Sequence, residues 1–545
     1  MMAFFARKVW CVTASLVFIL ATNGAASAAP LVDAGEEIIS TIQAMGFGGP
    51  STAKPSGSEA EGPYNTLVIE NAMIIDGTGA PTQGPMTVVI KNNIITDIHG
   101  AGTGSLHIGE LSYGDDARVI DAKGRYLLPG LVDAHVHYGN PAHIFGGALT
   151  DPDYVGKLFL ASGVTSVRDA GSAMGLGWTL EHKKLSEQGK ISAPRIVAYA
   201  MLPETTSSAS AARKWIRSVQ KRGADGVKML GARPEVIAAT LDETQSLGMG
   251  SAYHHAQVRV KQMNALDTAK LGLHSIEHWY GIPEAMFVEQ TIQNFPADYS
   301  YNNEQMRFAA AGRLWAQAAA PDSPQWRKLV QDLVATGITL VPTFAVYEAN
   351  RDVMRARTLE WHEAYSAGYM LKAFEPNPKV HGSYHYDWTT HNEIDWRENY
   401  RLWMRFVNDF KNAGGRVATG GDSGFIYSTY GFGLIRELEL LQEAGFHPLE
   451  ALQSATINGA KLLGLGDQIG TIEVGKRADM VLVNGNPLSN FKLLYPSGHY
   501  GIQPETGRPG WHAGIEYTIK NGIVYDVEQL RSQIREMVAI SKGAK

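Results

Sequence analysis

Eight short apolar runs, with helical patterns between them, constrain the fold of this 545-residue chain most strongly. Early in the series the runs are separated by about 25–30 residues, as in repeated strand–helix units. Strands that alternate with helices in this way form a parallel sheet, and eight of them close a barrel. The runs lie around His135 and at residues 164–167, 195–199, 227–229, 251–254, 274–278, 338–342 and 416–419. We therefore predict an α/β fold with a (β/α)8 TIM-like barrel over residues 129–465.

The two ends of the chain share a sequence pattern that differs from the strand–helix alternation of the middle: short β-rich runs are broken by turn signals. These runs fill residues 64–128 and 466–530. Because the two segments flank the barrel, we predict that they meet in one small composite β-sandwich. The last two intervals between barrel strands are stretched, so we also expect insertions of largely helical texture at about 281–330 and 350–411.

The first residues resemble an export signal. A short basic start precedes an apolar stretch, residues 9–21, that is too short to cross a bilayer, and small residues at 26–28 suit a signal peptidase. We predict a signal peptide over residues 1–28 and a flexible arm over residues 29–63. The protein would then be secreted or periplasmic, with no stable membrane anchor after signal removal. A membrane anchor is the alternative.

Cysteine content and charge exclude several classes of function. Cys11 is the only cysteine, and it lies within the predicted signal peptide. A mature chain would therefore have no disulfide and no thiolate metal site. The formal net charge is −6 and no basic run stands out, so the sequence offers no electrostatic basis for binding nucleic acid. We expect a small-molecule substrate, with a second copy of the chain as a candidate partner in a homo-oligomer.

Polar residues occupy the carboxyl ends of several predicted strands, which all face one mouth of such a barrel. His135 and His137 are two residues apart, so they project from the same face of an extended strand. The other positions are Lys228, His254, His278 and Asp422, on or just after the fourth, fifth, sixth and eighth strands. Imidazole with carboxylate is a ligand set of zinc, and manganese, cobalt and iron also accept it. Ordinary histidines of half-buried strands are the alternative.

Lys228 is unusual because its strand is otherwise apolar. Its stem can snorkel to the surface, or its amine can pair with an acid. Alternatively, burial lowers the pKa of the amine, and the neutral amine can take up carbon dioxide. The resulting carbamate has two oxygens, one for each of two metal ions. Both interpretations of Lys228 stay open from the residues alone.

Several motifs together resemble those of the amidohydrolase superfamily, from about Thr66 to Val524. The run LPGLVDAHVH at residues 128–137 is similar to the first-strand signature of that superfamily. Further segments that resemble motifs of that superfamily lie at residues 163–169, 275–278, 420–423 and 470–479. Residues 223–228 resemble the imidazolonepropionase-like and prolidase-like branch, in which the lysine is carboxylated.

This resemblance implies two divalent metal ions, most plausibly Zn²⁺. It assigns His135, His137, Lys228 and Asp422 to the first metal. It assigns Lys228, His254 and His278 to the second, with Lys228 N6-carboxylated. The family's pattern favours His254 over its neighbour His255, which points to the other side of a strand, but the choice stays open.

The expected function is that of an exported binuclear hydrolase, with a dipeptidase as one candidate, that cleaves an amide C–N bond in a dipeptide or N-acyl amino acid. A metal-bridging hydroxide would attack the carbonyl, and Asp422 would carry the proton to the departing nitrogen. A cyclic amide or lactone hydrolase and a mononuclear deaminase on the same barrel are alternatives. Gln257 disfavours deamination, since deaminases usually have a glutamate at that position. A non-catalytic scaffold is disfavoured, because every expected ligand type is present.

The second insertion contains a segment dense in aromatic residues and histidine, residues 381–396. Trp279 and Tyr280 also directly follow a predicted metal ligand. Such side chains can form a lid or a substrate pocket, or they can pack the added helices together. The sequence leaves both roles open.

Overall fold

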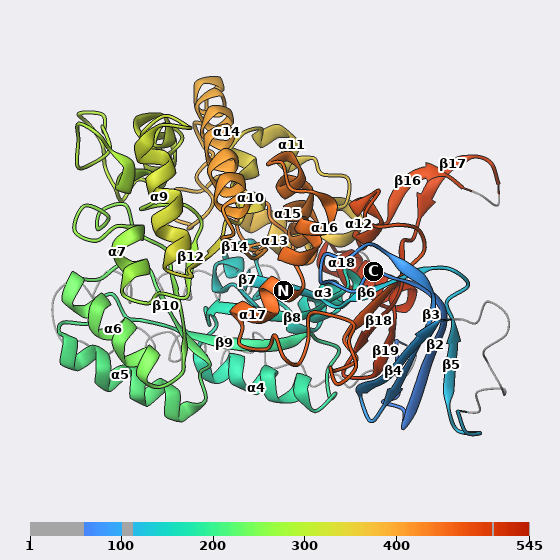
Figure 1. The fold of residues 1–545 in the computed structure, drawn as a ribbon. Coiled ribbons are helices and arrows are strands. Elements are labelled where there is room, and N and C mark those ends of the chain that lie inside the picture. Colours follow the sequence, from blue (N-terminus) through green and yellow to red (C-terminus); the bar gives the residue numbers. More distant parts are fainter. Residues whose placement is uncertain (1–58, 101–112, 504–505, 544–545) are drawn as a thin grey trace.

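An eight-stranded parallel sheet forms the centre of the computed structural model, which describes residues 59–100, 113–503 and 506–543 (Figure 1). Its strands pair in chain order from β7 to β14. They are β7 (Leu131–Val136), β8 (Val164–Gly171), β9 (Arg195–Met201), β10 (Gly226–Met229), β11 (Gly250–Tyr253), β12 (Ser275–Glu277), β13 (Thr339–Val341) and β14 (Arg416–Val417). Each coincides with one of the eight apolar runs, so the predicted strands of the α/β domain are confirmed.

The two outer strands of this sheet meet through the segment that follows β14. The backbone N–H of Ala134 donates to the carbonyl of Thr419 at 2.9 Å, and the N–H of Asp422 donates to the carbonyl of His135 at 2.8 Å. Val136 also forms a parallel bridge with the residue after Asp422. These contacts bend the sheet round into a TIM-like barrel, and they bring Asp422 directly beside His135.

Helices follow the strands and cover the sheet (Figure 1). They include α3 (Pro152–Ala161), α4 (Leu176–Glu187), α5 (Ala209–Arg222), α6 (Pro234–Ser246) and α7 (Ala265–Lys270), and, after β14, α15 (Phe432–Glu443), α16 (Pro448–Ser454) and α17 (Ile457–Leu462). In α5 the Ser208 side chain caps the first turn, and Gly223 ends the helix in a left-handed conformation. Ala212, Ile216 and Val219 form its buried face.

Two long connections lie on one side of the barrel, at the top of Figure 1. The first contains η2 (Pro283–Met286), α8 (Glu304–Ala311), η3 (Trp315–Gln317) and α9 (Pro324–Ala335). The second contains α10 (Phe344–Tyr347), η4 (Glu348–Asn350), α11 (Val353–Arg357), α12 (His362–Tyr365), α13 (Gly368–Phe374) and α14 (Thr390–Asn412). Residues 287–303 form turns where we expected helical texture. Three Asn and one each of Asp, Ser and Pro occur there, and these residues favour turns.

Much of the aromatic content of these connections packs the added helices together. Trp279, Trp315, Trp396 and Trp403 are at most 1% exposed. The ring of Trp279 lies 5.5–6.4 Å from the rings of the other three, in contacts typical of aromatic cores. Of the two roles left open by the sequence, packing therefore applies to these tryptophans.

Strands from both ends of the chain form a second sheet, of nine strands, beside the barrel (Figure 1). They are β1 (Ala60–Glu61), β2 (Thr66–Ile74), β3 (Gln83–Lys91), β4 (Ile94–Gly100), β5 (Arg118–Asp121), β6 (Tyr126–Pro129), β15 (Met480–Val483), β18 (Ile515–Lys520) and β19 (Ile523–Asp526). The described strands pair as one continuous sheet, so the meeting of the two ends is observed and the two-layered sandwich stays a prediction. β1 pairs with β19 at a position where we expected a flexible arm, because its backbone gains hydrogen-bond partners there.

The remaining elements are the 3₁₀ helices η1 (Pro141–Gly146) and η5 (Phe491–Leu494), the hairpin of β16 (His499–Ile502) and β17 (Pro509–His512), and the last helix α18 (Val527–Ser541). A buried ion pair between Arg195 and Asp479, at 2.5 Å, joins the barrel to the terminal sheet. No α-helix in the described part of the chain combines the length and apolar character that a membrane crossing requires. The predicted signal peptide and nearly all of the predicted arm lie outside the described residues.

Candidate metal centre

Asp422 is the point at which the predicted site residues meet. Its Oδ1 lies 3.2 Å from Nε2 of His137 and 3.6 Å from Nε2 of His135, and its Oδ2 lies 3.8 Å from Nε2 of His278. Nζ of Lys228 lies 3.3 Å from Nε2 of His135. These residues are far apart in the sequence. They gather because the carboxyl ends of β7, β10, β12 and β14 share one mouth of the barrel.

His254 is the sixth predicted residue, and its ring centre lies 4.6 Å from that of His278. The neighbouring His255 points elsewhere, because its Nε2 is 2.8 Å from the hydroxyl of Thr268 and its ring contacts Tyr253 at 4.0 Å. The structure therefore brings His254 to the other five residues and gives His255 a packing role.

These side chains offer donor atoms that suit a divalent cation. Ligand atoms of His135, His278 and Asp422 all lie within 4.8 Å of one another, and the three residues are buried. Imidazole nitrogens and a carboxylate oxygen are donor types that zinc accepts. This donor set therefore fits the metal that the sequence predicts.

The backbone is held in an unusual conformation at three positions around the centre. The φ angle is +62° at His278, +54° at Thr343 and +45° at Asp422. Residues with a Cβ seldom adopt this region, and a β-branched threonine does so least. Local contacts hold it here, since the N–H of His278 donates to the carbonyl of Val341 at 2.9 Å and its Nδ1 lies 2.5 Å from the Thr343 hydroxyl. Strain of this kind clusters at functional sites.

Burial keeps three imidazoles of the centre, those of His135, His254 and His278, neutral. It lowers the pKa of His135 to about 4, and the nearby charge of Lys228 adds to this effect. The pKa values of His254 and His278 also lie well below the ordinary value, with burial as the main cause. A neutral imidazole keeps a lone pair for a metal ion, so these rings are in the state that ligation needs.

Lys228 and Asp422 have opposite responses to the same surroundings. Burial lowers the pKa of the Lys228 amine to about 8, although the charges of Glu277 and Asp422 oppose this. Burial would raise the pKa of Asp422, but the imidazoles of His135 and His137 hold it well below its ordinary value. Asp422 is therefore ionised, and Lys228 has an unprotonated fraction near neutral pH, as carbamate formation requires.

Glu277 and Arg168 are parts of the centre that sequence reasoning missed. Glu277 is fully buried, and its Oε2 contacts Nδ1 of His135. Arg168 donates to both carboxylate oxygens of Glu277, at 2.7 and 2.8 Å, and to the carbonyl of Ala134 at 2.5 Å. A carboxylate on the second nitrogen of a metal-binding histidine orients the ring and fixes its tautomer. The available signal was a charged residue in an apolar strand, directly before the predicted ligand His278.

Two more buried carboxyl groups tie the loops of the mouth to the barrel. Asp133 accepts the N–H of Gly421 at 2.9 Å and that of His135 at 3.2 Å. Glu437 on α15 accepts the N–H of Ala345 at 2.8 Å, in the first turn of α10, which follows β13. Burial raises the pKa of Asp133 to about 7 and that of Glu437 to about 8. Each therefore fixes the backbone beside a site residue.

The two insertions form the rim of the centre. The ring of Phe425 lies 5.0 Å from that of His137 and 5.3 Å from that of His381. Glu304, at the start of α8, contacts Nδ1 of His381 and accepts the N–H of Gly382 at 2.9 Å. The insertions are thus joined to each other next to the loop that follows β14. His381, within the aromatic-rich segment, is a rim residue and not part of the core.

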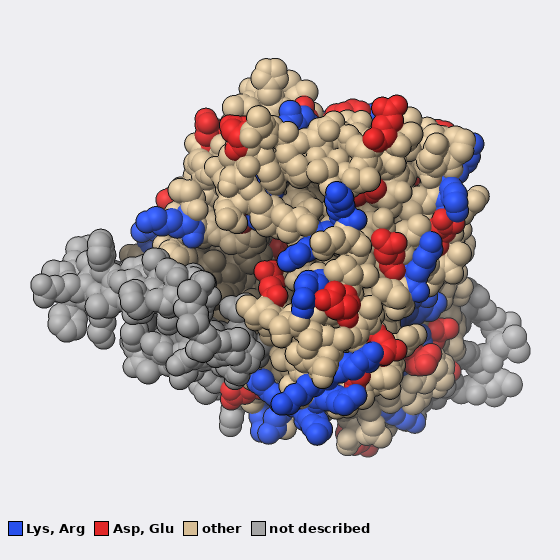
Figure 2. All heavy atoms as spheres, turned by 90° about the vertical axis from the view of Figure 1, so that its left-hand side faces the viewer, with Lys and Arg blue, Asp and Glu red and all other residues tan. Residues whose placement is uncertain are grey.

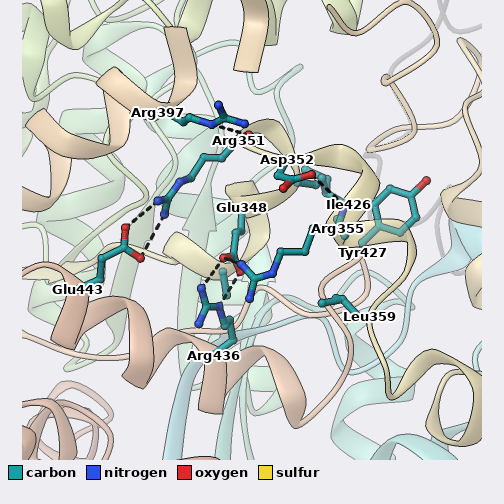
Figure 3. Close-up of a pocket in the computed structure, with 13 residues that line it drawn as sticks. Glu348, Arg351, Asp352, Arg355, Leu359, Arg397, Ile426, Tyr427, Arg436 and Glu443 are labelled. Atoms are coloured by element: carbon teal, nitrogen blue, oxygen red, sulfur yellow. Dashed lines mark hydrogen bonds and ion pairs between the residues drawn. The ribbon is translucent and has the colours of Figure 1, made fainter. Parts of the chain in front are cut away.

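A second charged region, the arginine pocket, is a cavity of about 210 Å³ (Figure 3). It is lined by Ala345, Glu348, Ala349, Arg351, Asp352, Arg355, Ala356, Leu359, Arg397, Ile426, Tyr427, Arg436 and Glu443. Its charged groups are largely paired: Arg436 donates to both oxygens of Glu348, and Arg351 donates to Glu443 at 2.7 Å. None of the six predicted site residues lines it. Figure 2 shows a surface of mixed charges, with Lys and Arg densest along the lower edge of that face.

Comparison with known proteins agrees with this geometry. Residues 404–501 match the model of the Amidohydrolase family. An imidazolonepropionase of Porphyromonas gingivalis is 23% identical over 455 residues, which cover 81% of this chain and 90% of that protein. A 5'-deoxyadenosine deaminase of Methanobrevibacter smithii is 34% identical over 77 residues, which cover 13% of this chain and only 18% of that protein.

Solved structures share the fold. A Xaa-Pro dipeptidase with methionine bound in its active site superposes with a TM-score of 0.53 at 20% identity, covering 85% of this chain and 100% of that one. The parallel barrel and the ligand-type residues at its mouth go with these matches, and the chain is thus similar to proteins of the amidohydrolase superfamily in part of its sequence and in its fold.

Proposed function

We propose that this protein is a metal-dependent hydrolase that cleaves an amide C–N bond. The observation that carries the proposal is the meeting of four imidazoles, an ionised carboxylate and a lysine at one mouth of the barrel. Neutral imidazoles around a buried carboxylate leave lone pairs unused unless a cation joins them. Relatives in the amidohydrolase superfamily support this class of activity.

Two divalent cations, with Zn²⁺ as the expected metal, fit this donor set. His135, His137, Lys228 and Asp422 would hold one, and a carboxylated Lys228, His254 and His278 would hold the other. When bound, such metals supply a water of lowered pKa and polarise the carbonyl of the substrate. Glu277 holds the ring of His135 in place for this role, and Thr343 holds that of His278.

Asp422 is the proposed proton carrier. Its carboxylate is ionised and reaches three of the imidazoles within 3.8 Å, so it borders the place where the reacting groups would lie. The carboxylate accepts a proton from the attacking water and donates it to the nitrogen that departs. The N–H of Asp422 is held by the carbonyl of His135, which keeps the carboxylate at that position.

We propose a dipeptide or an N-acyl amino acid as the substrate. The likeness to a solved Xaa-Pro dipeptidase supports this class. A cyclic amide is the second candidate, because the relative that matches over 455 residues is named an imidazolonepropionase. Deamination is less favoured, since Gln257 stands where we expect a glutamate in a deaminase.

We also propose that the protein is exported. The support comes from the sequence of residues 1–28, with its basic start, short apolar stretch and small residues before the expected cleavage point.

A substrate panel tests the function directly. Protein purified without chelator is incubated with dipeptides, N-acyl amino acids, cyclic amides and adenosine analogues, beside a metal-depleted sample. We expect turnover of a dipeptide or N-acyl amino acid that disappears on metal removal and returns with Zn²⁺. Ammonia release from the adenosine analogues alone would replace the proposal with deamination, and turnover that survives metal removal would refute it.

A further inference from the structure

The first insertion places a cation close to the metal centre. Arg307 on α8 is mostly buried, with 16% of its side chain exposed. Its guanidinium carbon lies 4.9 Å from the ring centre of Tyr301 and 5.2 Å from that of Phe308. Stacking on rings holds the guanidinium plane in place, while its N–H groups point outward from the edge of that plane.

A short series of ring contacts joins Arg307 to the proposed metal ligands. The ring of Phe308 lies 5.9 Å from that of Tyr347, which lies 5.5 Å from that of His278. Two aromatic rings, those of Phe308 and Tyr347, therefore link Arg307 to His278.

A buried phenol lies beside these rings. The hydroxyl of Tyr280 makes no hydrogen bond of good geometry among the described residues, although the phenol of Tyr347 is close enough to affect its pKa. Its ring lies 5.3 Å from that of His254 and 6.4 Å from that of Tyr347. Buried hydroxyls are nearly always paired, so an orphan beside a proposed metal ligand indicates that a bound molecule supplies the acceptor.

Arg307 has hydrogen-bond donors left over beyond those used by its existing partner. Glu304 accepts from Nη2 of Arg307 at 2.7 Å, and this contact uses one of five N–H groups. Glu304 is also shared with His381 and the N–H of Gly382, so its charge is spread over three donors. The guanidinium can therefore accept a second anion.

We infer that Arg307, with the hydroxyl of Tyr280, binds a carboxylate of the substrate and so selects N-acyl amino acids and dipeptides over uncharged amides. This inference rests on the proposed amide hydrolysis. Lys228 and Arg168 are already engaged inside the barrel with His135 and Glu277. A guanidinium binds a carboxylate through two parallel hydrogen bonds, and a neutral amide would leave a mostly buried charge without that partner.

The test compares charge-matched substrates. A panel of N-acetyl amino acids is paired, member by member, with the corresponding N-acetyl amino acid amides, which have the same shape and no carboxylate. We expect the metal-loaded wild-type protein to cleave the acids with kcat/KM at least about 100-fold above the amides, because the site's donors stay unpaired with the amides.

Variants assign that preference to Arg307. Arg307→Gln should lower kcat/KM for the acids by about 100-fold, mainly through KM, and change that for the amides by less than about 3-fold. Arg307→Lys should recover part of the loss, since it keeps the charge without the fork. Arg313→Gln is the matched control, because Arg313 lies in the same insertion, is half exposed and pairs loosely with Asp395 at 3.8 Å.

The outcomes separate this inference from the proposed function. Equal cleavage of acids and amides by the wild type, or equal losses on both in Arg307→Gln, overturns the inference. Cleavage of uncharged cyclic amides alone keeps C–N hydrolysis and also overturns the inference. If no amide is cleaved, calorimetric titration of zinc-loaded protein with the same panel decides: tighter binding of acids that is lost in Arg307→Gln supports it, and equal or undetectable binding overturns it.

Discussion

The metal centre and the arginine pocket are both rich in charge, yet their charges are arranged in opposite ways. In the arginine pocket each cation faces an acid of the protein itself, as Arg436 faces Glu348. In the metal centre three imidazole nitrogens lie within 3.8 Å of the single carboxylate of Asp422. The loop after β14 borders both regions, since Phe425 contacts His137 while Ile426 lines the pocket.

One helix shows how the protein itself supplies partners in the arginine pocket. Arg436 and Glu437 are neighbours on α15. Arg436 points into the pocket and pairs with Glu348 (Figure 3), and Glu437 accepts the N–H of Ala345, which also lines the pocket. A well-formed cavity with satisfied charges needs no ligand, and a tight cluster of unsatisfied donors does. Chemistry is therefore expected at the centre and not at the cavity.

The largest difference in activity should come from replacing one acidic residue in each region. Asp422→Asn removes the proposed proton carrier and a proposed metal ligand, so we expect kcat to fall by at least about 1,000-fold with the fold intact. Asp352→Asn in the arginine pocket removes a charge but keeps the helix-capping oxygen, and it should leave kcat within about 2-fold. Steady-state kinetics on the best substrate, with circular dichroism as the check on folding, measure both. Wild-type activity in Asp422→Asn would remove its assigned role.

The next difference concerns carboxylates that support other groups. Glu277→Gln should weaken metal affinity by about 10- to 100-fold, because His135 loses the partner that orients its ring. Glu348→Gln removes an equally well-paired carboxylate from the arginine pocket and should leave metal affinity unchanged. Competition with a chromophoric chelator measures both affinities. Equal losses in the two variants would mean that the effect is general destabilisation.

Two buried glutamates should respond to pH with opposite signs. Burial raises the pKa of Glu437 to about 8, so the folded state holds a proton that the unfolded state releases above about 4.5, and this contribution to stability is lost as pH rises towards 8. Burial also acts on Glu348, but Arg436 holds its pKa below the ordinary value, so its contribution is lost as pH falls.

Replacing Glu437 should show in which direction its contribution to stability changes with pH. Relative to the wild type, Glu437→Gln should gain on the order of 2 kcal/mol of unfolding free energy between pH 5 and pH 8, since it no longer ionises. Glu348→Gln should show no such gain. Urea denaturation of metal-free protein at the two pH values gives the comparison. A pH-independent difference between Glu437→Gln and the wild type would show that Glu437 does not titrate as described.

The smallest effect should come from the edge of the arginine pocket. Glu443→Gln breaks the ion pair with Arg351. The side chain of Arg351 is 22% exposed and that of Glu443 is 43% exposed, so we expect a loss of stability below about 1 kcal/mol and unchanged turnover. Thermal unfolding and kinetics check this. A large loss of activity would show that the arginine pocket takes part in the reaction.

The sequence was most informative where chemistry and periodicity coincide. Strand ends could be located from apolar runs, so six residues that approach one another in the barrel were predicted from their positions alone. His254 and His255 could not be separated by that logic, because only packing shows that His255 turns to Thr268. The pairing of Glu277 with Arg168 escaped because the two residues are 109 positions apart, although the charge of Glu277 in an apolar strand was a signal. Arg307 escaped because its place beside the barrel mouth depends on how the insertion folds back, which local sequence does not show.

Metal analysis tests the central claim most directly. Wild-type protein purified without chelator should contain about two equivalents of divalent metal per chain, and His278→Gln, which lacks one of the proposed ligands, should contain about one or fewer. Glu443→Gln should match the wild type. A wild-type protein that hydrolyses amides with almost no bound metal, or a His278→Gln variant with full metal content, would contradict the account.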